Sequence, residues 1–131
     1  MATISPRLVF RSALFATEPG EDESTNPGIF GKALAIWIGR ELVPGFTEDG
    51  IVAEDFGWLV AVPNPHHSLY IACSSTDESA QEWQLMAFAE GGLLSRLFGK
   101  GKHRETVDAL YAQLKSHLEA EAAVVGLREE Q

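Results

Sequence analysis

Three short segments of alternating side chains follow one another between residues 56 and 89, and their spacing constrains the fold more than any other feature. Segments 56–62, 69–73 and 83–89 carry apolar residues at every second position, a pattern typical of β-strands. The links between them, around residues 63–67 and 74–82, are short. Parallel neighbours need a crossover of about a dozen residues or more, so we expect an antiparallel meander.

The later strands of this meander are apolar on both faces. In segment 83–89, for example, Leu85 and Ala87 alternate with Met86 and Phe88, so neither face is polar. A sheet of such strands is either covered on both sides or carries an exposed apolar patch. The sequence leaves these two alternatives open.

Two helices are predicted to pack on the sheet. Asn26 and Pro27 suit the N-cap and the first position of a helix, which would run to about Leu42, before Pro44. A second apolar stripe at helical spacing covers residues 104–121. Further strands are expected at residues 7–15 and 122–127. The order is then β-α-β-β-β-α-β, an α+β fold with a mainly antiparallel sheet, in a single domain over residues 1–131.

The charge of the chain is unevenly distributed. There are 10 Lys and Arg residues against 19 Asp and Glu residues, which gives a net charge of −9. The segment from residue 41 to residue 90 contains acids and no Lys or Arg. The topology above predicts that its acids gather at one end of the sheet, away from any base: Glu48, Asp49, Glu54, Asp55, Asp77, Glu78 and Glu82. The acidic loop 18–23 is expected at the opposite end, beside the basic segment 96–104.

The leading hypothesis is a non-enzymatic binding domain whose acidic sheet end docks a basic partner protein. Acidic clusters raise the association rate with a basic surface and fit it by complementarity. The expected anchor is an aromatic residue, Trp58 or Trp83, if either is exposed. The expected acidic contacts are Asp49, Glu54, Asp55, Asp77, Glu78 and Glu82. The competing interpretation is that these acids only keep the domain soluble.

Two alternatives stay open. Glu54 and Asp55 stand close to Trp58 in the sequence, and a carboxyl pair in a pocket beside a tryptophan can act as acid and base in a small hydrolase-like enzyme. The other alternative is a weak anion or nucleic-acid contact through the basic residues Arg96, Lys100, Lys102 and Arg104. The net charge of −9 disfavours nucleic acid as a partner, because the protein repels phosphates at long range.

Metals, cofactors and membranes are not expected. The sequence contains no His-x-x-x-His and no Cys-x-x-Cys pair. Its longest uncharged run, residues 56–76, includes Pro63 and Pro65 and does not resemble a membrane span. The first residues lack the apolar run of a signal peptide, and a single cysteine cannot form an internal disulfide. We therefore expect a cytoplasmic protein, while its oligomeric state stays open.

Three motifs carry a family resemblance. The chain reads Asn26-Pro27-Gly28, then Glu54-Asp55-x-Gly57-Trp58, then Glu82-Trp83. This pattern resembles a family of small uncharacterised bacterial proteins over residues 25–118, and the resemblance implies no activity. In size and charge alone, the chain is also similar to immunity proteins that neutralise bacterial toxins. That likeness implies a protein partner and assigns no residue a role.

Overall fold

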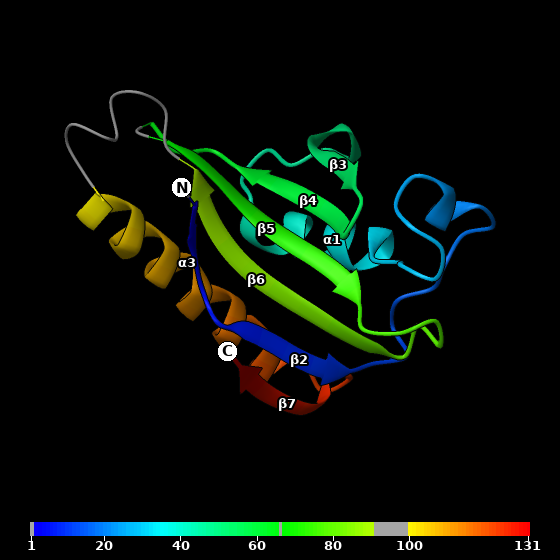
Figure 1. Ribbon diagram of the computed structural model, residues 1–131. Helices are drawn as coiled ribbons and strands as arrows, with labels where there is room; N and C mark the ends of the chain where they lie inside the picture. Colours follow the sequence, from blue (N-terminus) through cyan, green and yellow to red (C-terminus); the bar gives the residue numbers. More distant parts are fainter. Residues whose placement is uncertain (1, 66, 91–99) are drawn as a thin grey trace.

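The expected meander is the centre of the fold. The computed structural model describes residues 2–65, 67–90 and 100–131 (Figure 1). Strands β4 (Gly57–Val62), β5 (Ser68–Ser75) and β6 (Glu82–Glu90) pair antiparallel in chain order, with Trp58 opposite Cys73 and Cys73 opposite Leu85. The other strands are β1 (Ala2–Ile4), β2 (Arg7–Arg11), β3 (Ile51–Glu54) and β7 (Val125–Glu130).

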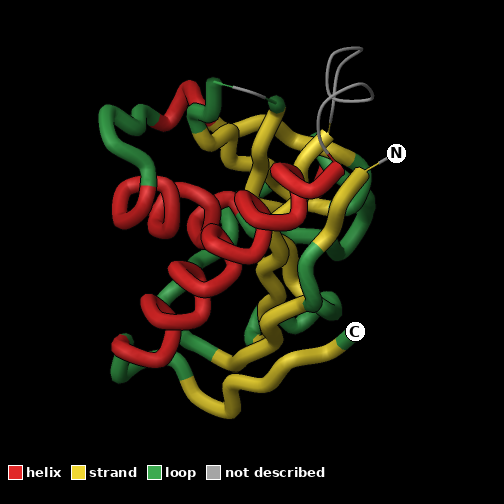
Figure 2. The backbone as a smooth tube through the Cα atoms, turned by 90° about the vertical axis from the view of Figure 1, so that its left-hand side faces the viewer, coloured by secondary structure: helices red, strands yellow, loops and turns green. Residues whose placement is uncertain are grey.

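All seven strands of the described residues form one antiparallel sheet in the order β3-β4-β5-β6-β2-β7, and β1 pairs with the far end of β6. Helices α1 (Lys32–Leu42) and α3 (Lys100–Ala120) lie on one face of it, as Figure 2 shows. Single 3-10 turns form at Glu21–Glu23 and Glu48–Gly50. The α+β class with two helices on a mainly antiparallel sheet is confirmed.

Two strands, β1 and β3, were not predicted. They are three and four residues long, too short to show a period. The strand expected at residues 7–15 ends at Arg11, and β7 begins at Val125 rather than residue 122. The short edge strand β3 has the largest consequence, because it reverses the chain once more before β4.

The core lies between the sheet and the two helices. Alternate residues of the central strands point toward the helices and are buried, while α1 adds Leu34 and Ile38 and α3 adds Leu114 and Leu118. The buried strand residues include Leu8, Phe10, Trp58, Val60, Ile71, Cys73, Trp83, Leu85 and Ala87. This apolar layer stabilises the fold by removing large side chains from water.

Helix α1 begins five residues later than predicted from Asn26-Pro27. The backbone before it is hydrogen-bonded to the end of β5, since Ser75 N donates to Phe30 O at 2.7 Å and Phe30 N donates to Ser75 Oγ at 3.0 Å. In a helix that began at Pro27, Phe30 N would donate to Asn26 O and Phe30 O would accept from Leu34 N. The bonds to Ser75 take the place of these helical bonds, so the helix starts after Phe30. Its first N–H groups are capped from a distance: the buried Glu21 carboxylate accepts from Gly31 N at 2.8 Å and Lys32 N at 3.1 Å.

Two glycines lie against the carbonyl of Cys73. A Cβ atom at Gly31 would lie 2.6 Å from Cys73 O, and one at Gly57 would lie closer still. Both residues also have positive φ angles, 156° and 146°. Glycine is therefore required at the start of α1 and at the start of β4, where three segments meet.

Replacing Gly57 with alanine should lower the free energy of unfolding by at least about 2 kcal/mol, because the added methyl group meets backbone that cannot move aside. The measurement is urea unfolding followed by tryptophan fluorescence. The matched control is Gly50→Ala, whose Cβ would meet no atom nearer than 3.8 Å. Equal stability of the two variants would contradict this account of the junction.

The capping role of Glu21 gives a second prediction. Glu21→Ala leaves the Gly31 and Lys32 N–H groups without their acceptor and should cost about 2 kcal/mol. The exposed neighbour substitution Glu23→Ala should change stability by less than about 0.5 kcal/mol. The same unfolding assay tests both, and a Glu21→Ala variant as stable as Glu23→Ala would show that the cap contributes nothing.

Candidate functional site

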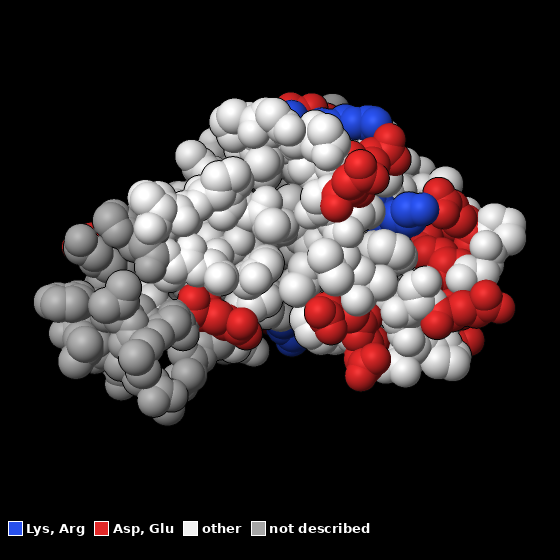
Figure 3. All heavy atoms as spheres, turned by 90° about the horizontal axis from the view of Figure 1, so that it is seen from above, with Lys and Arg blue, Asp and Glu red and all other residues white. Residues whose placement is uncertain are grey.

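The acidic end of the sheet is formed by the β3–β4 turn and the β5–β6 loop. Because β3 pairs with β4 and β5 with β6, Asp55, Asp77 and Glu78 lie at the same end, where their side chains are exposed. Figure 3 shows acidic side chains crowded at the right-hand end of that view. This part of the predicted cluster is brought together by the fold.

The loop that contains residues 18–23 lies at this end too, so its predicted position at the opposite end was wrong. Asn26 Nδ2 donates to the Asp55 carbonyl oxygen at 2.9 Å, and Gly28 packs against Glu78. Asp22 accepts from Gly28 N at 2.9 Å. The loop is held here because α1 starts at the end of β5.

The predicted positions of Glu48 and Asp49 were also wrong. The unpredicted strand β3 runs antiparallel to β4, with Ile51 opposite Val60. Residues Glu48–Gly50 precede β3 and therefore lie at the other end of the sheet, where Glu48 pairs with Arg40 at 3.1 Å. Asp49 is thereby separated from the other acidic residues of the predicted contact set.

The acidic end is not free of bases, contrary to expectation. Glu82 accepts from Thr76 Oγ1 at 2.8 Å and pairs with Arg128 at 3.3 Å. These hydrogen bonds, that of Thr76 first, lower the pKa of the Glu82 carboxyl. Lys32 pairs with Glu18 at 2.9 Å. The exposed acids at this end without an ion pair to a described residue are Glu23, Glu54, Asp55, Asp77 and Glu78.

The two tryptophans considered as anchors, Trp58 and Trp83, are not exposed. Trp83 is 1% exposed and its indole N–H donates to Ser12 O at 3.2 Å, while Trp58 is 9% exposed and faces the helices. Trp58 shares its face with Ala53, its partner on β3, whereas Glu54 lies on the opposite face. The carboxylate of Glu54 therefore has no tryptophan pocket beside it. The aromatic side chain exposed at this turn is Phe56, at 51%.

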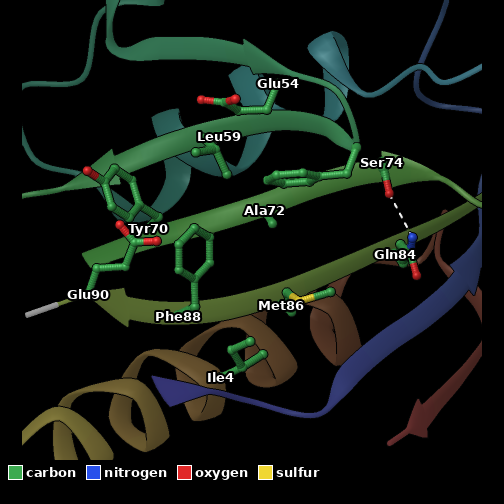
Figure 4. A pocket seen from close by; sticks show the side chains of 11 residues that line it. Ile4, Glu54, Leu59, Tyr70, Ala72, Ser74, Gln84, Met86, Phe88 and Glu90 are labelled. Carbon is green, nitrogen blue, oxygen red and sulfur yellow. Dashed lines mark hydrogen bonds between the residues drawn. The ribbon is translucent and has the colours of Figure 1, made fainter. Parts of the chain in front are cut away.

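The face of the sheet opposite the helices carries a groove of about 550 Å³ (Figure 4). Tyr70 and Phe88 stack across two strands with ring centroids 5.1 Å apart. At one end Gln84 Nε2 donates to Ser74 Oγ at 2.8 Å, and the carboxylates of Glu54 and Glu90 stand at the margin. The lining is Ile4, Glu54, Phe56, Leu59, Tyr70, Ala72, Ser74, Gln84, Met86, Phe88 and Glu90.

The groove resolves the alternatives left by the two-faced apolar strands, because no described helix or strand lies over this face. Sequence reasoning did not name Tyr70, Met86, Phe88 or Glu90 as site residues. The sequence did contain a sign of this apolar face, because these residues alternate along β5 and β6 with residues of the core. The sequence does not indicate which face of the sheet the two helices cover.

The basic segment is only partly described. Arg96 lies outside the described residues, whereas Lys100 and Lys102 fall in the first turn of α3, which starts four residues earlier than predicted. Arg104 pairs with Asp108 at 3.1 Å and donates to Ile4 O at 3.3 Å. Arg104 therefore ties α3 to β1, and the described side chains of this segment give no observation that favours an anion.

Other chemistry finds little support in the described part of the chain. Within it, no three His, Cys, Asp or Glu side chains are placed to hold a metal ion. Burial raises the pKa of the Cys73 thiol above its ordinary range, which keeps the thiol protonated and unreactive. None of the described helices combines the length and apolar character that crossing a membrane requires. No family model, curated protein or solved structure matches the chain.

The hydrogen bond of Glu82 to Thr76 and its ion pair with Arg128 predict how the Glu82 carboxyl titrates. The Glu82 pKa should lie below its ordinary value of 4.5, so the stabilisation it gives is present above that value and is lost as the pH falls through the lower, folded-state pKa. Thr76→Val should raise the Glu82 pKa, as measured by carboxyl-carbon NMR titration. Ser79→Ala removes a hydroxyl bonded to Asp77 instead and is the control. An unchanged Glu82 pKa in Thr76→Val would contradict the assignment.

Proposed function

We propose that the protein is a non-enzymatic binding domain that docks a basic partner protein at its acidic end. The observation that carries the proposal is a set of exposed carboxylates, without ion pairs to described residues, that share this end: Glu23, Glu54, Asp55, Asp77 and Glu78. Unpaired carboxylates on one surface attract a basic protein over long range and raise its association rate.

The acidic end is also held in place before any partner arrives. Asn26 holds the Asp55 backbone, Asp77 accepts hydrogen bonds from Ser79 N at 2.9 Å and Ser79 Oγ, and the 18–30 loop is bonded to β5. A preorganised surface loses less conformational entropy on binding. This rigidity favours specific docking over the alternative in which the acids serve solubility alone.

The most specific form of the proposal is an inhibitor of the immunity type, in which this end covers the basic active site of a toxin. This form is supported by the opposite charges of the acidic end and of a basic active site, and by the small size of the chain. Relative to the predicted contact set, the proposal omits Asp49, which lies at the other end, and Trp58, which is buried. Glu82 is a weaker contact because Arg128 already neutralises it.

The test is capture of basic proteins from the native host's lysate at low and moderate salt, with Asp55→Lys/Asp77→Lys beside the natural chain. This variant should lose the salt-sensitive partner or bind it at least about tenfold more weakly. The control Asp49→Lys/Glu105→Lys makes the same change in net charge at the opposite end and should keep the partner. Equal capture by the two variants, or no salt-sensitive partner, would overturn the proposal.

A further inference from the structure

The open groove offers a second contact surface next to the acidic end. Glu54 and Phe56 belong to the turn that also carries Asp55, and both line the groove. We infer that the groove receives an amphipathic helix of the partner, with its apolar side against the sheet and its Lys or Arg side chains toward Glu54 and Glu90. The basic character of this helix rests on the proposed function.

The apolar floor favours an apolar occupant. Leu59, Ala72, Met86 and the stacked pair of Tyr70 and Phe88 form it, and none of these side chains is charged. Ile4 and Phe56 at its margin are 53% and 51% exposed. Exposed apolar side chains that border an apolar groove favour the binding of another molecule there.

The shape of the groove suits a helix better than a small molecule. It extends across strands β3 to β6, and β5 and β6 are eight and nine residues long, or roughly 25–30 Å. A helix about 10 Å wide can lie on such a face with apolar residues three, four and seven apart. Small ligands are usually enclosed on most sides, whereas the described elements form one wall only. A bound helix would add a third layer to the fold.

The charges at the margin decide between occupants. Glu54 and Glu90 have no ion pair with a described residue, and both flank the groove in Figure 4. They disfavour an acidic helix. They also disfavour a second copy of this chain, because two molecules of net charge −9 would bring four such carboxylates together.

The protein contains its own reporter for the test, since it has two methionines and one of them, Met86, lies in the groove floor. The full chain is labelled with ¹³C-methyl methionine, and Met86→Leu assigns the signal. The probe is a synthetic 18-residue helical peptide whose leucines lie on one side of the helix and whose lysines lie on the other. The Met86 methyl signal should shift and saturate with this peptide, but not with a matched peptide of leucine and glutamate.

Variants separate the groove from the acidic end. Two variants should each weaken peptide binding about tenfold, measured as the peptide concentration that gives half of the full Met86 shift. They are Phe56→Ser, in an exposed turn, and Glu54→Lys/Glu90→Lys. Val125→Ser, an equally exposed apolar residue on β7, should leave peptide binding unchanged. Asp55→Lys/Asp77→Lys should still give the full Met86 shift at saturation, because these residues lie outside the groove.

Several results would overturn the inference. Peptide binding that leaves Met86 unmoved places the contact at the acidic end alone, so the groove inference fails while the proposed function stands. A Met86 signal that changes with protein concentration alone indicates a second copy. A response to the decyltrimethylammonium ion without a response to the peptide indicates a small-molecule site. An equal response to the glutamate peptide removes the role of Glu54 and Glu90.

Discussion

The crowded contact at the Cys73 carbonyl is the constraint on which the rest of the structure depends. Gly31 and Gly57 approach this carbonyl so closely that neither position has room for a Cβ atom. Beside it, Ser75 holds the backbone of Phe30 and the buried Glu21 caps α1. The start of α1, the start of β4 and the end of β5 are thereby fixed together, and α1 is committed to one face of the sheet.

Both candidate surfaces follow from this junction. The loop before α1 has to reach the end of β5, so its acids join Asp77 and Glu78 at that end. The β3–β4 turn then serves two surfaces within a few residues: Glu54 lines the groove, while the backbone of Asp55 is tied to Asn26 at the acidic end. A partner that spans the two surfaces would contact one hydrogen-bonded edge of the molecule, and such preorganisation lowers the entropic cost of binding.

The sequence predicts the parts of the fold that depend on local periodicity. The meander and α3 were confirmed because alternation and helical stripes persist over many residues. The start of α1 was wrong because Asn26-Pro27 is a local signal, and hydrogen bonds to Ser75 override it. The position of Asp49 was wrong because four residues of β3 leave no period to read, yet they reverse the chain. The groove could be suspected from the two apolar faces but not located, since helix packing is a long-range outcome.

An exposed apolar face lowers the stability of the free protein, and a partner that buries this face regains that free energy. Half-exposed side chains such as Ile4 and Phe56 forgo about 1 kcal/mol each of the stabilisation that burial would give. Polar residues at these two positions would be compatible with the main core cluster, because neither Ile4 nor Phe56 belongs to it. The stability of the free domain therefore does not explain the half-exposed Ile4 and Phe56 at the margin of the groove. Burial against the proposed helix would account for them, because the free energy forgone in the free protein would then contribute to association.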